Sequence, residues 1–262
     1  MVPIKITILG CGTSTGVPTI GCKCAVCKSS HPKNKRLRSS IMITRLDDGR
    51  NIVIDTTPDF RAQMLRENVS SIEAVLYTHT HADHCHGFDD LRAFYFFSGK
   101  PIPCYLSREH LFDLKSRFSY AFEETGYLGL PPQVTLLEME SKVDIWSDME
   151  IEVVRLEHGN VMSAAFRMGS FAYATDFKCF SESVLEMWSG KISLMVASGL
   201  RFSEHKTHSS IPETIQIFER LGVQRGIITH MAHEVEYEQH SQQLAPHIEL
   251  AYDGMQIEHT VR

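Results

Sequence analysis

A dense run of histidines in the first third of the chain limits its fold and chemistry more than any other feature. Residues 78–84 read T-H-T-H-A-D-H and follow an apolar stretch with the composition of a β-strand. Alternate strand side chains share one face, so His79 and His81 leave the strand end together. The turn that follows can bring Asp83 and His84 onto a second metal ion. Because imidazole and carboxylate suit zinc, manganese or iron, the run predicts a centre of two divalent cations.

The H-x-H-x-D-H pattern of residues 79–84 resembles the signature of the metallo-β-lactamase superfamily of hydrolases. Further superfamily elements follow apolar runs in the expected order, so the resemblance covers nearly the whole chain. It implies three histidine ligands for the first metal, two histidines and an aspartate for the second, and one shared carboxylate. In that order they are His79, His81 and His158, then His84, His230 and Asp83, and finally Asp176. The residue that matches Asp55 orients a ligand in this superfamily and does not bind metal.

Three of the seven cysteines lie on one tight loop, at Cys22, Cys24 and Cys27. Thiolates are soft ligands that suit zinc, and a closed tetrahedral site needs a fourth ligand. Within the superfamily, this loop is similar to that of the phosphoribosyl cyclic phosphate phosphodiesterases. The resemblance implies His233, three positions after the last active-site histidine, as the fourth ligand. We therefore predict a structural zinc that ties the loop at about residues 21–28 to the wall of the active site.

Two early segments are candidates for contacts with a phosphate group. Residues 10–16 form a glycine-rich turn, whose exposed backbone N–H groups favour phosphate and make Thr13 and Ser14 candidate substrate contacts. The turn lacks the lysine of a P-loop, so a plain tight turn explains it as well. Further along, Arg36 and Arg38 are candidates for phosphate or ribose contacts, with a basic surface loop as the alternative.

A histidine near the start of a later helix is the candidate acid of the reaction. His208 precedes the helix predicted over residues 212–221, where an imidazole can bond a phosphate oxygen or protonate a leaving alkoxide. The segment resembles the His-Ser-Thr element of superfamily phosphodiesterases, which implies that His208 is a general acid or transition-state stabiliser. His205 is the second choice. The structural alternative is that Thr207 or Ser209 caps the helix beside a solvated histidine.

The remaining pattern indicates an α/β protein of one domain. Short β-rich runs alternate with helical patterns, and hairpin-like strands are concentrated in the first half. Two mixed sheets packed face to face with helices outside, an αββα sandwich, accommodate this order. Periodicity alone also allows another α/β layering. The resemblance implies the αββα metallo-β-lactamase fold over residues 1–262.

The composition narrows the expected partners. The chain has 26 lysines and arginines against 32 acidic residues, and this net charge of −6 removes the electrostatic reason for nucleic-acid binding over the whole surface. No apolar run approaches the roughly 18 residues of a membrane span, and the first residues lack the pattern of a secretory signal. Clustered cysteines suit a reducing compartment, so we predict a cytoplasmic protein. The resemblance suggests a homodimer.

These features predict hydrolysis of a small phosphodiester, with a five-membered ribose cyclic phosphate as the first choice. A hydroxide that bridges two Mn²⁺ or Zn²⁺ ions would attack phosphorus, while one structural Zn²⁺ would hold the thiolate loop. Asp83 or Asp176 would accept a hydrogen bond from the nucleophile, and we choose Asp83 as the catalytic partner of His208.

Several alternatives share the fold. Processing of tRNA 3′ ends uses the same metals and histidine, but enzymes of that kind carry a long basic arm that we do not find in this sequence. Hydrolysis of a thioester or β-lactam fits the thiolate loop and the His208 segment less well. A non-catalytic protein of cofactor biosynthesis is the alternative from another class, because a similar cysteine-rich loop occurs in the superfamily member linked to pyrroloquinoline quinone.

Overall fold

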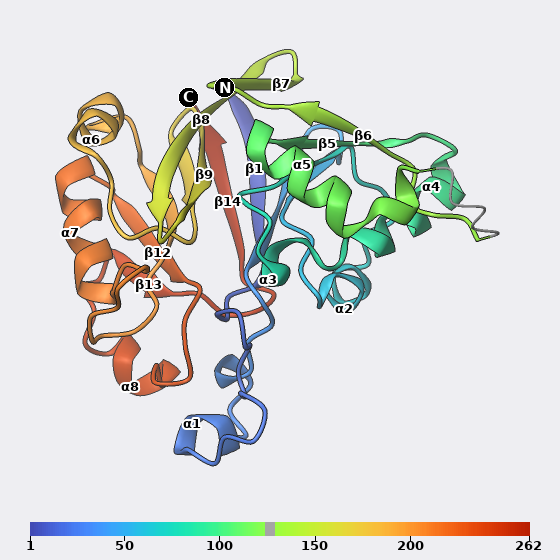
Figure 1. Cartoon of the computed structure of the whole chain (residues 1–262). Helices are drawn as coiled ribbons and strands as arrows, with labels where there is room; N and C mark the ends of the chain where they lie inside the picture. Colours follow the sequence, from blue (N-terminus) through green and yellow to red (C-terminus); the bar gives the residue numbers. More distant parts are fainter. Residues whose placement is uncertain (124–128) are drawn as a thin grey trace.

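Two mixed β-sheets of seven strands each pack face to face in the computed structural model, with helices on their outer sides (Figure 1). The structure describes residues 1–123 and 129–262. This architecture confirms the predicted αββα sandwich of the metallo-β-lactamase fold. None of the helices in the described ranges has the length and apolar character needed to cross a membrane.

The first sheet places the first and last strands of the chain side by side. In spatial order its strands are β14 (Gln256–Val261), β1 (Val2–Gly10), β2 (Ser40–Arg45), β3 (Asn51–Ile54), β4 (Ala74–Leu76), β5 (Ile102–Leu106) and β6 (Val134–Glu138). Strands β3 to β6 run parallel to one another. The alternating isoleucines of β1 explain its conformation, since Ile4, Ile6 and Ile8 are fully buried on one face of the strand.

The second sheet combines an antiparallel hairpin with a parallel half. In spatial order its strands are β13 (Ile248–Leu250), β12 (Arg225–Thr229), β11 (Leu194–Ser198), β10 (Phe171–Ala174), β9 (Val161–Met168), β8 (Met149–His158) and β7 (Lys142–Trp146). Strands β10 to β13 are parallel, and β8 and β9 form the longest hairpin of the described chain. Phe166 and Tyr173 join the β1 isoleucines in one buried core between the sheets.

The helices fall into two sets, one from each half of the chain. Those of the first half are α2 (Phe60–Arg66), α3 (Ala82–Cys85), α4 (Arg92–Ser98) and α5 (Arg108–Arg117), with short 3-10 turns at η1 (Pro32–Asn34), η2 (Phe88–Leu91) and η3 (Ser119–Ala121). Those of the second half are α6 (Glu182–Trp188), α7 (Ile211–Leu221) and α8 (Tyr237–Ser241). Helix α1 (Ala25–Lys28) lies apart from both sheets in a protruding segment (Figure 1).

Helix α7 begins and ends close to the residues that the sequence predicts. Ser210 caps its N-terminus and forms a reciprocal capping box with Glu213. Gly222 ends the helix with a left-handed φ of 71°, a conformation that glycine adopts without a steric penalty. The predicted range of 212–221 therefore differs from the observed helix by one residue. Ser210, and not Thr207 or Ser209, is the cap.

Candidate metal centre

Four strands end beside one another at the site, and the backbone turns sharply where three of them end. Asp55, Asp176 and His230 follow β3, β10 and β12, and they have φ angles of 66°, 51° and 56°. Among the described residues, they are three of the four non-glycine residues with positive φ. Such backbone costs free energy and is concentrated at functional sites. The fourth strand end, β4, leads into the histidine run.

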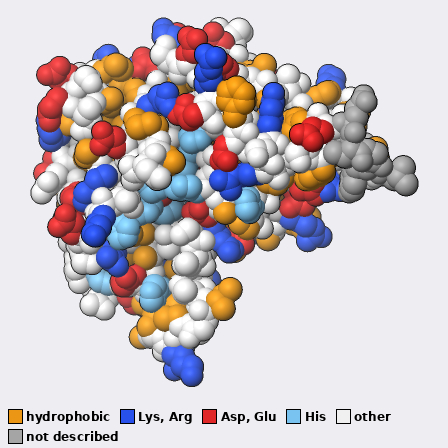
Figure 2. Space-filling view, viewed as in Figure 1, with side chains coloured by type: hydrophobic (Ala, Val, Ile, Leu, Met, Phe, Trp, Pro, Cys, Tyr) orange, Lys and Arg blue, Asp and Glu red, His pale blue; other side chains and the backbone are white. Residues whose placement is uncertain are grey.

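Three histidines from distant segments form the first group of candidate ligands. The ring centroid of His79 lies 4.5 Å from that of His81 and 5.3 Å from that of His158. Ligand-type nitrogens of all three residues lie within 4.8 Å of one another. His79 and His158 are buried, whereas His81 is partly exposed. Figure 2 shows histidine side chains gathered at the centre of this face, with lysines and arginines on either side.

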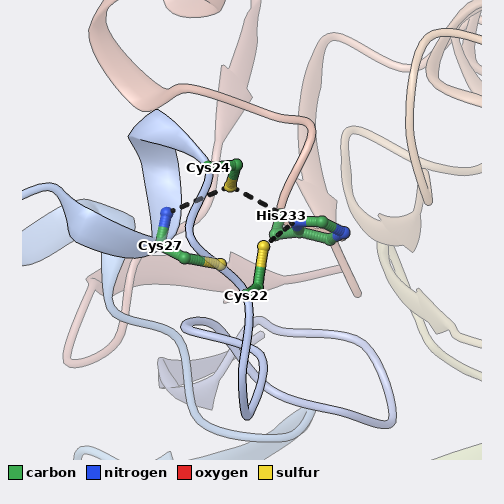
Figure 3. Close-up of side chains that lie close together, drawn as sticks. All are labelled: Cys22, Cys24, Cys27 and His233. Carbon is green, nitrogen blue, oxygen red and sulfur yellow. Dashed lines mark hydrogen bonds between the residues drawn. The ribbon is translucent and has the colours of Figure 1, made fainter.

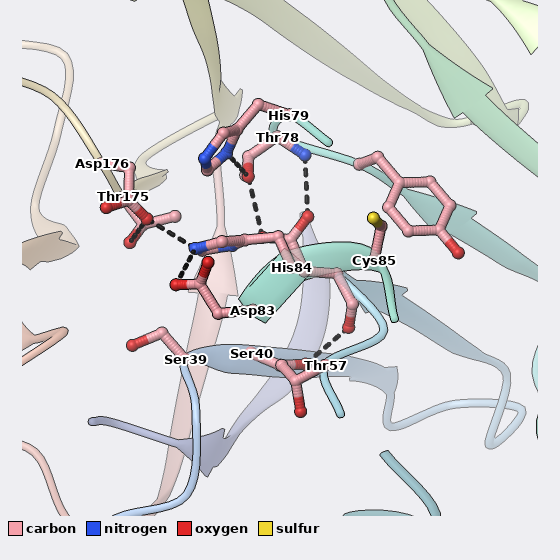
Figure 4. Close-up of polar contacts among 12 residues, drawn as sticks. Ser39, Ser40, Thr57, Thr78, His79, Asp83, His84, Cys85, Thr175 and Asp176 are labelled. Atoms are coloured by element: carbon pink, nitrogen blue, oxygen red, sulfur yellow. Dashed lines mark hydrogen bonds and ion pairs between the residues drawn. The ribbon is translucent and has the colours of Figure 1, made fainter. Parts of the chain in front are cut away.

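The second group lies directly beside the first. His84 Nε2 is 3.3 Å from Asp83 Oδ2, and His230 Nε2 is 3.7 Å from the same oxygen. Asp176 stands between the groups, with Oδ2 2.7 Å from His84 Nε2 and Oδ1 3.2 Å from His230 Nε2. Figure 4 shows Asp83, His84 and Asp176 directed toward one another. The structure thus brings together all seven residues that the sequence nominated as active-site ligands, whose ligation remains a prediction.

Asp55 fixes the orientation of the second group from behind. Its carboxylate accepts hydrogen bonds from the backbone N–H and the hydroxyl of Thr78, both at 2.8 Å, and from His84 Nδ1 at 2.7 Å. A proton on His84 Nδ1 directs the lone pair of Nε2 into the centre. This is the position expected for a ligand-orienting residue. Sequence reasoning missed Thr78, although its place directly before the histidine run was a usable signal.

The chemistry of the donor set fits divalent cations. His79 Nδ1 lies 3.0 Å from the Thr78 hydroxyl, while its buried Nε2 has no hydrogen-bond partner among the described residues. His158 Nδ1 donates to the Thr207 carbonyl at 3.1 Å, which leaves its other nitrogen for the centre. A buried, unpaired polar atom is costly unless a ligand or ion satisfies it. Nitrogen lone pairs and carboxylates at this spacing form a suitable cradle for metal.

The protonation states of the first group and of Asp176 agree with that conclusion. Burial lowers the pKa of His79 well below its usual value, and also lowers the pKa of His81 and His158. These rings are therefore neutral at pH 7 and able to act as ligands. Burial alone would raise the pKa of Asp176, but its histidine neighbours, chiefly His230 and His84, hold it well below the usual carboxyl range. The central carboxylate is consequently ionised.

His208 lies at the open side of the centre. Its Nδ1 is 3.1 Å from Asp176 Oδ1, and its ring centroid is 4.6 Å from that of His158. About 17% of the His208 side chain is exposed, so solvent and substrate can reach it. His205 lies farther out, with its ring 5.1 Å from that of His208. The geometry therefore suits His208 better than His205 as the proton donor.

The three clustered cysteines and His233 form a separate group outside the central site (Figure 3). His233 Nδ1 lies 3.4 Å from both Cys22 Sγ and Cys24 Sγ. The backbone N–H of Cys27, followed by His233, lowers the pKa of the Cys24 thiol to about 6. A readily formed thiolate suits a metal ligand. The segment after His230 connects this group to the central site, because His233 follows it by three residues.

Of the two arginines predicted to contact substrate, one is buried and the other is partly exposed. Arg36 is only 2% exposed, and its guanidinium donates to the carbonyls of Ala232 at 3.2 Å and Val235 at 2.7 Å. The prediction that Arg36 binds substrate is therefore wrong, because its donors hold the segment that leads to the cysteine site. Arg38 is partly exposed, pairs with Asp59 at 2.8 Å and donates through Nε to the Ser14 carbonyl.

Thr13 and Ser14 differ in the same way. Thr13 is buried, and its N–H donates to the Met231 carbonyl at 3.1 Å. Ser14 is exposed next to Arg38. The backbone of this turn is thus fixed against the segment that carries His230, while Ser14 and Arg38 remain accessible candidates for substrate contact.

Comparison with known proteins agrees with this geometry. The model of the β-lactamase superfamily domain matches residues 50–231. A protein named octanoyltransferase from Porphyromonas gingivalis is 34% identical over 256 residues, which are 97% of this chain and 51% of that protein. Coenzyme PQQ synthesis protein B from Methylobacterium radiotolerans is 28% identical over 191 residues, 63% of this chain and 62% of that protein. The chain thus spans about half the length of the first relative and less than two thirds of the second.

A solved structure gives a fuller match. It is described as a new diphosphatase from the PhnP family, and it is 38% identical to this chain with a TM-score of 0.90. The superposition covers 98% of this chain and 97% of that one. The similarity therefore includes both sheets and the loops between them.

Proposed function

The chain belongs to the metallo-β-lactamase superfamily and is PhnP-like, and from that premise we propose that it hydrolyses a small phosphodiester with two divalent cations. The observation that carries the proposal is the convergence of the two ligand groups on Asp176, with His208 Nδ1 3.1 Å from its carboxylate. A five-membered ribose cyclic phosphate is the preferred substrate, as the similarity to cyclic phosphate phosphodiesterases suggests. The substrate's small size agrees with the absence of strong positive charge in the sequence.

The residues around the centre have distinct roles in this proposal. Bound Mn²⁺ or Zn²⁺ would lower the pKa of a water molecule and neutralise charge on the phosphate. His208 Nδ1 lies 3.1 Å from Asp176 Oδ1, and in this proposal Nε2 would protonate the departing oxygen. Asp83 would accept a hydrogen bond from the attacking water. Asp55 holds His84, so the second ligand group keeps its geometry when substrate binds.

We also propose that Cys22, Cys24, Cys27 and His233 hold a structural zinc. Four soft or borderline ligands within 4.8 Å of one another support a closed tetrahedral site. Because His233 follows His230 by three residues, such a zinc would fix one edge of the catalytic centre. Its role would be to hold the protruding loop and not to bind substrate.

A second candidate substrate class is a diphosphate. The observation that favours it is the description of the 38% identical structure as a diphosphatase. A P–O–P anhydride and a phosphodiester place the same charged oxygens around phosphorus, so one centre could accept either. The leaving group separates them, since an alkoxide needs a proton donor more than a phosphate does.

The deciding experiment is a hydrolysis assay of purified protein with added Mn²⁺ or Zn²⁺. The panel contains a ribose cyclic phosphate, an inorganic and an organic diphosphate, and bis-p-nitrophenyl phosphate. We expect metal-dependent turnover, highest with the cyclic phosphate. Higher turnover of the diphosphates would favour the second class. If none of these substrates is hydrolysed in the presence of metal, the proposal is contradicted and a binding protein of cofactor biosynthesis is favoured.

Homodimer formation and a cytoplasmic location remain predictions. Light scattering tests the first and cell fractionation tests the second.

A further inference from the structure

A fourth buried histidine lies beside the first ligand group without belonging to it. His110 is on α5 and is 5% exposed, and its ring centroid lies 6.3 Å from that of His79. Its Nε2 lies 2.8 Å from the Met162 carbonyl oxygen, and its Nδ1 lies 3.1 Å from the Thr80 hydroxyl. Both nitrogens are therefore engaged by protein groups. No nitrogen of His110 is left to bind metal.

The two partners of His110 lie on the two segments that supply the first ligand group. Thr80 stands between His79 and His81 in the histidine run. Met162 lies on β9, where it pairs with Glu157, the neighbour of His158 on β8. One imidazole thus contacts both the turn that carries two of the histidines and the hairpin that carries the third.

The hydrogen-bond chemistry makes this link directional. A carbonyl oxygen only accepts, so Nε2 of His110 carries a hydrogen and donates it to Met162. The Thr80 hydroxyl lies within hydrogen-bond distance of His110 Nδ1 and also 2.5 Å from Asp113 Oδ2, one turn along α5. Arg117 Nε donates to the same carboxylate oxygen at 2.9 Å. The single hydroxyl hydrogen of Thr80 can be donated either to Asp113 Oδ2 or to His110 Nδ1, so two residues of one helix contact the Thr80 side chain.

The link also joins the two halves of the sandwich. Helix α5 follows β5 of the first sheet, whereas Met162 belongs to the second sheet. His79 and His81 follow β4 of the first sheet, and His158 ends β8 of the second. The distance between these ligands depends on how the sheets are positioned at this edge. His110 bonds across that junction.

We propose that His110, with Thr80, is a positioning residue that sets the spacing of His79, His81 and His158 for metal binding. The inference rests on the proposed metal centre. It assigns no contact between His110 and substrate. Residues that orient metal ligands contribute about 10–100-fold to affinity. Because His110 acts on the segments and not on a ligand ring, we expect an effect near the lower end, about 10-fold.

The test measures zinc retention during dialysis against graded concentrations of chelator. The variants are His110→Phe, which keeps an aromatic ring but removes both polar contacts, and Thr80→Val, which removes the hydroxyl alone. His110→Gln can restore the donor to Met162. Exposed His247→Phe is the matched control for loss of an imidazole. We expect His110→Phe and Thr80→Val to lose about one zinc equivalent at about 10-fold lower chelator concentration than the unchanged protein, with His110→Gln intermediate.

Cobalt-loaded protein separates selective loss from general unfolding. Thiolate-to-cobalt absorption reports the cysteine site alone, and we expect it to be unchanged in His110→Phe and in Thr80→Val. Retention equal to that of the unchanged protein, or equal loss from every site, would overturn the positioning role. If His110→Phe does not fold, Thr80→Val decides between the same outcomes. An unchanged protein that binds neither Zn²⁺ nor Mn²⁺ outside the cysteine site would overturn the proposed function itself, which is a distinct result.

Discussion

The central cluster and the cysteine cluster are built in opposite ways. The central ligands come from strand ends of both sheets and from the short helix α3, and most are buried. The cysteine cluster takes three ligands from six consecutive residues of a protruding loop and one histidine from elsewhere. The central cluster also has supporting hydrogen bonds, such as those of Asp55, whereas two of the three cysteines are partly exposed. The comparison teaches that a reacting centre is held by the whole fold, while a structural clip can be local.

The largest effect is expected at the central cluster, for the loss of His208. His208→Ala should lower kcat by about 10²–10⁴-fold, because a positioned proton donor contributes that much. Metal content should stay unchanged, since the seven proposed ligands remain. Steady-state kinetics and elemental analysis measure both quantities. His205→Ala is the matched control and should keep most of the turnover. Full activity of His208→Ala would remove the assigned role.

The second largest effect is expected for Asp55, which supports the central cluster through its hydrogen bond to His84. Asp55→Asn should weaken metal binding or activity by about 10–100-fold, because the amide cannot hold His84 as a carboxylate does. Chelator competition followed by elemental analysis measures the change. Exposed Asp48→Asn provides a control for loss of a carboxylate on the surface. If Asp55→Asn binds metal as tightly as the unchanged protein, the orienting role is wrong.

A smaller effect is expected at the cysteine cluster. Cys24→Ser should remove about one zinc equivalent and lower the melting temperature, since a structural zinc contributes to folding. Turnover should fall less than in Asp55→Asn, because only one edge of the centre, near His230, is loosened. Cys179→Ser, at an exposed cysteine outside the cluster, is the control. An unchanged zinc count in Cys24→Ser would exclude a zinc at this loop.

The smallest effect is a pH dependence in protein stripped of metal. The pKa of Cys24 is lowered to about 6, so the thiolate persists at neutral pH. Its depressed pKa contributes stability that is complete above the usual thiol pKa and is lost as pH falls through about 6. Alkylation of Cys24, followed by mass spectrometry, should therefore have its midpoint near pH 6. A midpoint near the usual pKa of a thiol would contradict the arrangement around His233.

The parts of the site that could be predicted from sequence are those where ligands share one short segment. His79 and His81 follow one strand, and strand alternation alone places them together. His158 and His230 lie far apart in sequence, so only the resemblance nominated them, and the fold brings them to the same edge. The left-handed backbone at Asp176 has no signature in a single sequence.

Buried polar residues caused the clearest failure. A basic residue such as Arg36 is usually expected at the surface. Its buried guanidinium instead donates hydrogen bonds to two backbone carbonyls in the irregular segment at residues 232–235. Nothing in the spacing of residues 36–38 indicates that Arg36 is buried while Arg38, two residues later, is partly exposed. His110 was missed for a related reason. Its partners Thr80 and Met162 become neighbours only when the two sheets pack.

The central claim is that the two ligand groups hold a pair of cations around Asp176. Anomalous diffraction from crystals loaded with Mn²⁺ tests it most directly. We predict two strong peaks, one among His79, His81 and His158, and the other among Asp83, His84 and His230, with Asp176 between them. Crystals that show no peak within reach of Asp176 would contradict the account.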